Sequence, residues 1–239
     1  MTPRARARIQ IAAVMLLLVA GGLIAVSGCD PRTLAYFVQP FESTIPPPEG
    51  APSLEGKKVV ILCNVTSGAV AEYPSLERDV PRVLADILRK KVKKITIVEP
   101  DKIATWVEAH PHWTDPADAA RDFGADIAIF LEVEQFQSQT PGDLNMVHGE
   151  SKVHIQVFEL DYPKNSKDKP IKDQPKEAHN IYDGYAESSF PNRGPLPIDS
   201  GTSRAAFKHT FLKIVVKEVS WHFVEHREED SIQDSRIEK

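Results

Sequence analysis

The chain has 239 residues, of which 41% are hydrophobic, 29 are basic and 34 are acidic. This length allows one domain with a substantial core after a leader segment. The net charge of −5 argues against nucleic acid and anionic lipid surfaces as partners, because both attract basic proteins.

The N-terminus has the three parts of an export signal over residues 1–28. Arg4, Arg6 and Arg8 provide the positive start, and an uncharged, mostly apolar run follows over 11–26. Small residues then lead to a cysteine, as they do at the cleavage sites of exported proteins. The segment therefore predicts export of the chain from the cytoplasm.

The sequence Val26-Ser27-Gly28-Cys29 matches the lipobox that the lipoprotein signal peptidase recognises. Small residues suit a peptidase that binds an extended backbone at the membrane face, and the Cys29 thiol is the nucleophile that takes up the diacylglyceryl group. We predict cleavage after Gly28 and lipidation of Cys29, with palmitate-type chains holding the mature protein to the membrane. Two or three acyl chains bind far more firmly than one.

Two other interpretations of the leader stay open. The run 11–27 approaches the ~20 apolar residues of a transmembrane helix, and an ordinary secretion signal could precede a chance cysteine. All three interpretations place the folded part outside the cytoplasm, facing the periplasm. Asp30 follows the lipidation site. In some enteric bacteria this residue favours the inner membrane, so inner and outer membrane both stay open.

The mature chain is more acidic than the precursor. The leader holds three arginines and no acid, so 26 basic residues face 34 acidic ones, a net charge of −8. Lipid rather than charge is therefore expected to hold it to the membrane. Cys63 has no disulfide partner if Cys29 is acylated, and its apolar neighbours predict a buried strand position. A Cys29–Cys63 disulfide is the alternative if lipidation fails.

The mature chain divides into three segments. Residues 29–56 contain three consecutive prolines at 46–48 and three more elsewhere, which favours an extended spacer of the polyproline II type. Residues 57–226 carry the regular patterns of one α/β domain. Residues 227–239 form a charged C-terminal tail.

Hydrophobic periodicity predicts the elements of this domain in chain order. The expected strands are 59–65, 95–98, 126–135, 151–160 and 179–189, and the expected helices are 74–92, 100–109, 115–124 and 202–225. Polar, proline-containing loops fill 161–176 and 190–201. The order β-α-β-α-α-β-β-β-α predicts an α/β fold that leans towards α+β, in which a single mixed β-sheet of about five strands has helices packed on it.

The segment 115–126 reads Asp-Pro-Ala-Asp-Ala-Ala-Arg-Asp-Phe-Gly-Ala-Asp and runs straight into an apolar strand. Gly124 allows a tight reversal, and Ala125 allows close contact between helix and sheet. Here the chain resembles the small α/β domain shared by the curli-secretion lipoproteins, the lipoprotein activators of penicillin-binding proteins and the amino-terminal domain of the Tol-Pal propeller protein. The resemblance implies an envelope lipoprotein that binds or assembles with other proteins.

The likeness in sequence covers residues 115–133, and the element order extends it over 57–224. Two features depart from that family. The first strand ends in Cys63-Asn64, where the family often has Pro-Phe, and the 161–176 loop is long. The likeness therefore bears on fold more than on function.

The stretch 222–226, His-Phe-Val-Glu-His, matches the H-x-x-E-H pattern of some zinc peptidases. On a helix, His222 and His226 could share one zinc ion, with Glu225 as the base. A third ligand normally lies far downstream, but only 13 residues follow His226. We therefore expect incidental surface histidines and keep a zinc-dependent hydrolase as an alternative function.

Two further groups of polar residues have structural interpretations. His110 and His112 belong to a loop in which Trp113 is expected to pack on the domain, although the pair could bind metal adventitiously or serve a hydrolase. Glu132 and Glu134 share one face of a strand and are expected to lie on the solvated side of the sheet.

The sequence thus predicts a membrane-anchored extracytoplasmic lipoprotein that acts as a non-catalytic accessory or assembly protein of the cell envelope. We expect no catalytic residues, no metal and no cofactor. The expected partners are membrane lipid, through acylated Cys29, and an envelope protein. A small-ligand carrier is a further alternative, which would need a sizeable apolar pocket between sheet and helices.

Overall fold

A computed structural model describes residues 44–140, 142–143, 145–163, 176–192, 194–198, 203–227 and 230 of the chain. The predicted leader, the lipobox with Cys29 and the first part of the spacer lie outside the described residues. So do most of the 161–176 loop and most of the C-terminal tail. Among the residues that are described, no helix is both long enough and apolar enough to cross a bilayer.

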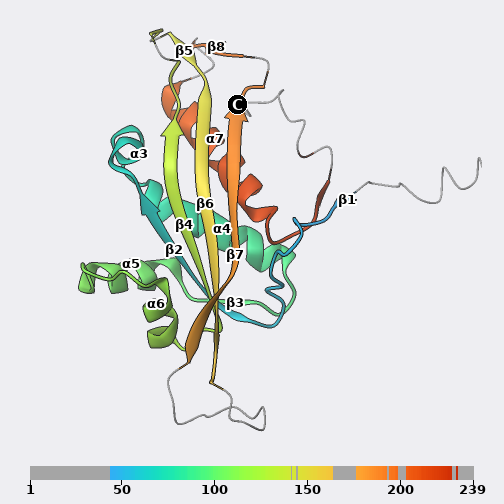
Figure 1. The fold of residues 1–239 in the computed structure, drawn as a ribbon. Coiled ribbons are helices and arrows are strands. Elements are labelled where there is room, and N and C mark those ends of the chain that lie inside the picture. The colour runs from blue at the N-terminus through green and yellow to red at the C-terminus, as the bar shows by residue number, and fades with distance from the viewer. Residues whose placement is uncertain are drawn as a thin grey trace, which may run out of the picture. The chain divides into compact units, whose positions relative to one another are not determined.

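Five strands form one mixed sheet in the spatial order β3-β2-β4-β6-β7 (Figure 1). The strands are β2 (Lys58–Val65), β3 (Thr96–Ile97), β4 (Ile127–Gln137), β6 (Gly149–Asp161) and β7 (Glu177–Phe190). Strand β2 runs parallel to β3 and β4, whereas β4, β6 and β7 are antiparallel neighbours. The sheet confirms the predicted fold class.

Four of the helices cover the two faces of this sheet in pairs. Helices α4 (Leu76–Lys91) and α7 (Arg204–Ser220) pack on one face, and α5 (Pro100–Ala109) and α6 (Pro116–Phe123) pack on the other. The predicted bounds of α5 are confirmed. Helix α6 is capped as its sequence suggests, since Asp115 accepts a hydrogen bond from the Ala117 amide and Gly124 adopts a left-handed φ of 58°.

Two helix predictions were wrong at their ends. The helix predicted over 74–92 begins at Leu76 in the structure. A separate short helix, α3 (Ser67–Glu72), lies before it in the chain and was not predicted. The last helix ends at Ser220 instead of continuing to residue 225, and it is followed by turns. Periodicity missed the end because Phe223 and Val224 are also buried and extend the apolar pattern.

Four short strands complete the described structure. Strand β1 (Thr44–Ile45) pairs antiparallel with β9 (His226–Arg227), and β5 (Met146–Val147) pairs with β8 (Leu196–Pro197). Each has two residues, too few for periodicity to detect. Packed structure also begins before residue 57, since Leu54 is buried in the core.

Strand residues alternate between two hydrophobic clusters. Ile61, Ile129 and Ile155 face α4 and α7, whereas Val60 and Ala128 face α5 and α6. On the α4–α7 side, Phe211 packs so closely on β6 that a Cβ added at Gly149 would lie 2.6 Å from its ring. Only glycine fits at that point.

Cys63 occupies the buried strand position that the sequence predicted. Its side chain faces the α4–α7 cluster and forms no disulfide with a described residue. Burial raises the pKa of the Cys63 thiol, so the reactive thiolate is disfavoured at neutral pH.

Candidate functional site: an aromatic pocket beside an open sheet face

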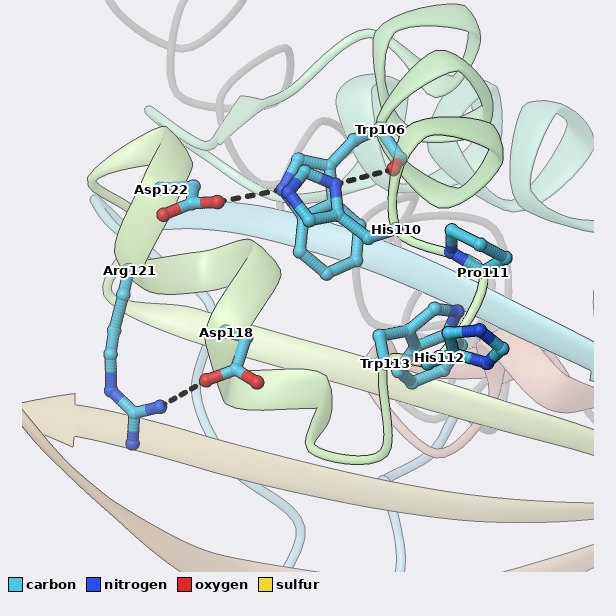
Figure 2. A pocket seen from close by; sticks show the side chains of 8 residues that line it. All are labelled: Trp106, His110, Pro111, His112, Trp113, Asp118, Arg121 and Asp122. Atoms are coloured by element: carbon cyan, nitrogen blue, oxygen red, sulfur yellow. Dashed lines mark hydrogen bonds and ion pairs between the residues drawn. The ribbon is translucent and has the colours of Figure 1, made fainter.

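A pocket of about 490 Å³ opens on the hairpin formed by α5, the loop after it and α6 (Figure 2). Its walls combine aromatic rings with carboxylates and an arginine. The lining residues are Trp106, His110, Pro111, His112, Trp113, Asp118, Arg121 and Asp122. We call this cavity the aromatic pocket.

Trp106 anchors the pocket from α5. Its indole ring is 8% exposed, and its Nε1 donates a 2.8 Å hydrogen bond to Oδ2 of Asp122 on α6. His110, one helical turn later, stacks on this indole with ring centroids 4.4 Å apart. Since a carbonyl can only accept, Nδ1 of His110 donates to the Trp106 carbonyl oxygen at 2.8 Å. The two helices are therefore held together through their polar groups.

Trp113 connects the pocket to the sheet. Its half-buried ring lies 6.3 Å from the ring of Trp106 and meets the Phe130 ring edge-on at 5.7 Å. Phe130 belongs to β4 and is the cross-strand neighbour of Gln156 on β6. The loop packing expected for Trp113 is confirmed, and the loop places His110 and His112 at the pocket.

Arg121 is engaged by neighbours within its own hairpin and beyond it. Its guanidinium lies 2.7 Å from Asp118 and 3.3 Å from Asp115, and its Nε donates to the Lys176 carbonyl oxygen at 3.2 Å. These ion pairs are partly exposed, so each contributes roughly 0–1 kcal/mol to stability. Their main effect is to fix the direction of the α6 side chains.

Next to the pocket, part of this face of the sheet has no helix of the described residues over it. The apolar residues that α5 and α6 cover give way, along β4, β6 and β7, to polar side chains. We call this surface the open sheet face; by strand alternation it comprises Glu132, Glu134, Glu150, Lys152, His154, Gln156, Asp183, Tyr185 and Glu187.

Cross-strand contacts order the open sheet face. His154 lies between two carboxylates, 2.9 Å from Asp183 and 4.0 Å from Glu132, and its ring stacks on Tyr185 with centroids 4.6 Å apart. The hydrogen bond from His154 holds the pKa of Asp183 below its usual range. Tyr185 is 46% exposed, the largest exposure among the described bulky hydrophobic residues.

Lys152 is a second basic residue of this surface. Its ammonium lies 3.0 Å from Glu134 and 4.4 Å from the centre of the Tyr185 ring. The contact with Glu134 raises the pKa of Lys152. Glu132 and Glu134 thus lie on the solvated side of the sheet, as expected, but each has a basic neighbour that offsets the repulsion between them.

The structure does not assemble the zinc pattern on a helix. Because α7 ends at Ser220, His222 and His226 do not share a helical face, and that premise was wrong. Nδ1 of His222 lies 2.5 Å from the Tyr182 hydroxyl, and burial lowers the His222 pKa. The His226 ring stacks on Trp221 at 4.1 Å. Within the described ranges, no three His, Cys, Asp or Glu side chains are arranged to hold a metal ion.

A small-ligand carrier would need a pocket between the sheet and the helices, and the aromatic pocket does not lie there. Its lining comes from the α5–α6 hairpin alone, not from the space between sheet and helices. Sequence reasoning missed the contribution of Asp118, Arg121 and Asp122. Their spacing of three and four residues places them on one face of α6, and this spacing is the signal by which the sequence could have identified them.

No protein-family model matches the chain, and no curated protein matches it. Similar solved structures include the PelC dodecamer of Paraburkholderia phytofirmans, with 12% identity over 77% of this chain and 96% of that chain, at a TM-score of 0.38. Lipoprotein GNA1162 of Neisseria meningitidis has 10% identity over 71% and 99%, at 0.38. The hypothetical protein CT253 of Chlamydia trachomatis has 13% identity over 71% and 97%, at 0.38. At these scores the likenesses carry no weight for function, which is therefore inferred from the residues of this chain.

Proposed function

We propose that this protein is a membrane-anchored extracytoplasmic lipoprotein that acts as a non-catalytic accessory or assembly protein of the cell envelope. Acylated Cys29 provides the anchor, and the aromatic pocket with the open sheet face provides the surface for a partner protein. The lipobox and the family resemblance in sequence support the first part. The arrangement of the domain supports the second.

One observation carries the proposal: the spacer joins the domain on the side of the sheet opposite the pocket. Strand β1, the first described part of the chain, pairs with β9. Strand β9 follows Phe223 and Val224, which are buried in the cluster under α4 and α7. Helices α5 and α6, whose residues line the aromatic pocket, pack on the other face of the sheet (Figure 1). A spacer attached there leaves the pocket accessible to a partner.

The contacts of the pocket also fit binding better than catalysis. His110 and Arg121 are engaged by neighbours, and both lining carboxylates are exposed. Asp118 is paired with Arg121, and Asp122 accepts from the Trp106 indole. Such groups are held in fixed directions, as recognition requires. Trp and Arg are also the residue types that dominate binding energy in protein interfaces.

Anchoring is tested with Cys29→Ala in the native bacterium. We expect the variant to be released from the membrane fraction or to keep its leader, because no thiol is left to accept the diacylglyceryl group. Membrane fractionation and intact-protein mass spectrometry measure both outcomes. Membrane retention together with the wild-type mass would contradict the anchor.

Partner binding is tested with a photo-cross-linking amino acid introduced at His112 or Tyr185. We expect a discrete adduct with an envelope protein after irradiation of cells, identified by mass spectrometry. Lys213 is an exposed position on α7 and is the matched control, at which that adduct should be absent. Equal cross-linking from all three positions, or from none, would contradict an interface on the α5–α6 side.

A further inference from the structure

Two hydrogen-bond donors of the aromatic pocket are bonded to acceptors of the pocket itself. Trp106 donates to Asp122, and His110 donates through Nδ1 to the Trp106 carbonyl. This hydrogen bond leaves the second ring nitrogen of His110, Nε2, uncommitted. Oδ1 of Asp122 also keeps its lone pairs, because the indole bonds to Oδ2. The pocket therefore offers acceptors to a ligand.

The guanidinium of Arg121 does not reverse this balance. Its Nε and Nη1 are directed at the Lys176 carbonyl and at Asp118 and Asp115. In Figure 2 the Arg121 guanidinium reaches towards Asp118, which lies between it and Trp113 in this view. A ligand that enters beside Trp113 thus meets aromatic surface and free acceptors before it meets a cation.

Aromatic walls and hydrogen-bond acceptors together favour a ligand group that is cationic, flat and rich in hydrogen-bond donors. The face of a tryptophan attracts cations, more strongly than other aromatic rings do. A guanidinium combines positive charge, a flat surface that stacks on aromatic rings and five N–H donors in one plane. A volume of about 490 Å³ is large enough to admit such a side chain.

The surface beside the pocket has complementary charge for a basic segment. The open sheet face carries five carboxylates, which are Glu132, Glu134, Glu150, Asp183 and Glu187, against one lysine. It adjoins the pocket through Trp113 and Phe130. An acidic protein segment, a nucleic acid or an anionic membrane would be repelled there.

We propose that the aromatic pocket receives an arginine side chain of the partner protein, between Trp113 and Asp122, and that basic residues flanking this arginine lie over the open sheet face. The inference rests on the proposed function, because it names the chemistry of the partner at the same site. It specifies a protein segment with one central arginine and neighbouring lysines or arginines.

The test uses the full acylated chain in detergent and a short fluorescein-labelled peptide with one arginine between two lysines. A second peptide carries citrulline, which is uncharged but similar in shape, in place of the arginine. Fluorescence anisotropy gives the dissociation constants. We expect citrulline to weaken binding about tenfold, a difference of about 1.4 kcal/mol.

Three variants locate the effect. Asp122→Asn keeps an oxygen for the Trp106 indole but removes the charge, and it should weaken the arginine peptide about fivefold or more while leaving the citrulline peptide nearly unchanged. The pair Glu150→Lys and Glu187→Lys reverses charge on the open sheet face and should weaken both peptides about tenfold. The pair Glu55→Lys and Glu225→Lys makes the same charge change at exposed positions elsewhere and should have less than about a twofold effect.

Each result decides the inference. Equal binding of the arginine and citrulline peptides, equal effects of the two double variants, or no binding to the wild-type protein would overturn it. Near-ultraviolet circular dichroism is the control that checks whether Asp122→Asn keeps the native packing. If the peptides fail while His112 and Tyr185 still cross-link a partner in cells, the proposed function stands and only the arginine inference falls.

Discussion

The two faces of the sheet are built differently, although the same strands supply both. Towards α4 and α7, the alternating side chains of β2, β4 and β6 are mostly apolar and buried, and Ser151 is a polar exception. Towards α5 and α6, the apolar pattern covers only the near half, and charged side chains continue beyond it. The first face therefore supplies most of the stability, and the second leaves an ordered polar surface exposed to solvent.

This difference can be followed within one strand. Strand β4 begins with a continuous apolar run, Ile127 to Leu131, as expected where helices cover both faces. From Glu132 onwards polar and apolar residues alternate apart from a bulge at Glu134, because among the described residues only the α4–α7 side has helices over this part. The position at which a continuous run becomes an alternating one thus marks the edge of the helical layer.

The largest expected effect is on the free energy of unfolding. It is found by comparing the truncation of one aromatic residue on each face of the sheet. Phe211→Ala should lower the free energy of unfolding by about 3–5 kcal/mol, because the ring is fully buried and would leave a cavity. Trp113→Ala should cost only about 1–2 kcal/mol, because that ring is half exposed. Urea denaturation measures both. Equal losses of unfolding free energy in the two variants would contradict the division between a face that supplies most of the stability and one that supplies little.

A second prediction concerns a carboxyl that is an exception on the apolar side. Glu218 of α7 has one carboxyl oxygen buried without a hydrogen-bond partner. Burial raises the Glu218 pKa, while Ser188 and Lys217 oppose the rise. The folded state therefore holds this proton to higher pH than the unfolded state does. From the ordinary glutamate pKa of about 4.3 up to the raised folded value, increasing pH then costs stability.

Glu218→Gln should remove this cost. We expect the variant to be more stable than the wild type at about pH 7 and to lose that advantage near about pH 4, where both states of the wild type are protonated. Urea unfolding at the two pH values measures the difference. A stability difference that is the same at both would show that the carboxylate is not destabilising.

The smallest effect is expected on the open sheet face. His154→Ala removes the contacts to Asp183, Glu132 and Tyr185, yet it should cost less than about 1 kcal/mol because the carboxylate partners are exposed to water. Thermal unfolding at low and high salt measures this contribution. A loss as large as that for Phe211→Ala would mean that the open face is part of the stabilising structure.

The sheet and most of its helices could be predicted from the sequence because the signals for them are local. The Asp115 cap, the Gly124 reversal and the strand periods each lie within a few residues. The aromatic pocket could not be derived in the same way. It depends on Trp106 reaching Asp122 across two helices and on Trp113 meeting Phe130. Such contacts are fixed by tertiary packing, which no local pattern reports.

The pairing of β1 with β9 has a practical consequence for the two ends of the described domain. Because the strands are antiparallel, with Thr44 opposite Arg227 and Ile45 opposite His226, the chain before Thr44 and the chain after Arg227 leave the pair at the same end. A label placed at Thr44 or at Arg227 would therefore report on the same part of the domain, on the side of the α4–α7 cluster and away from α5 and α6.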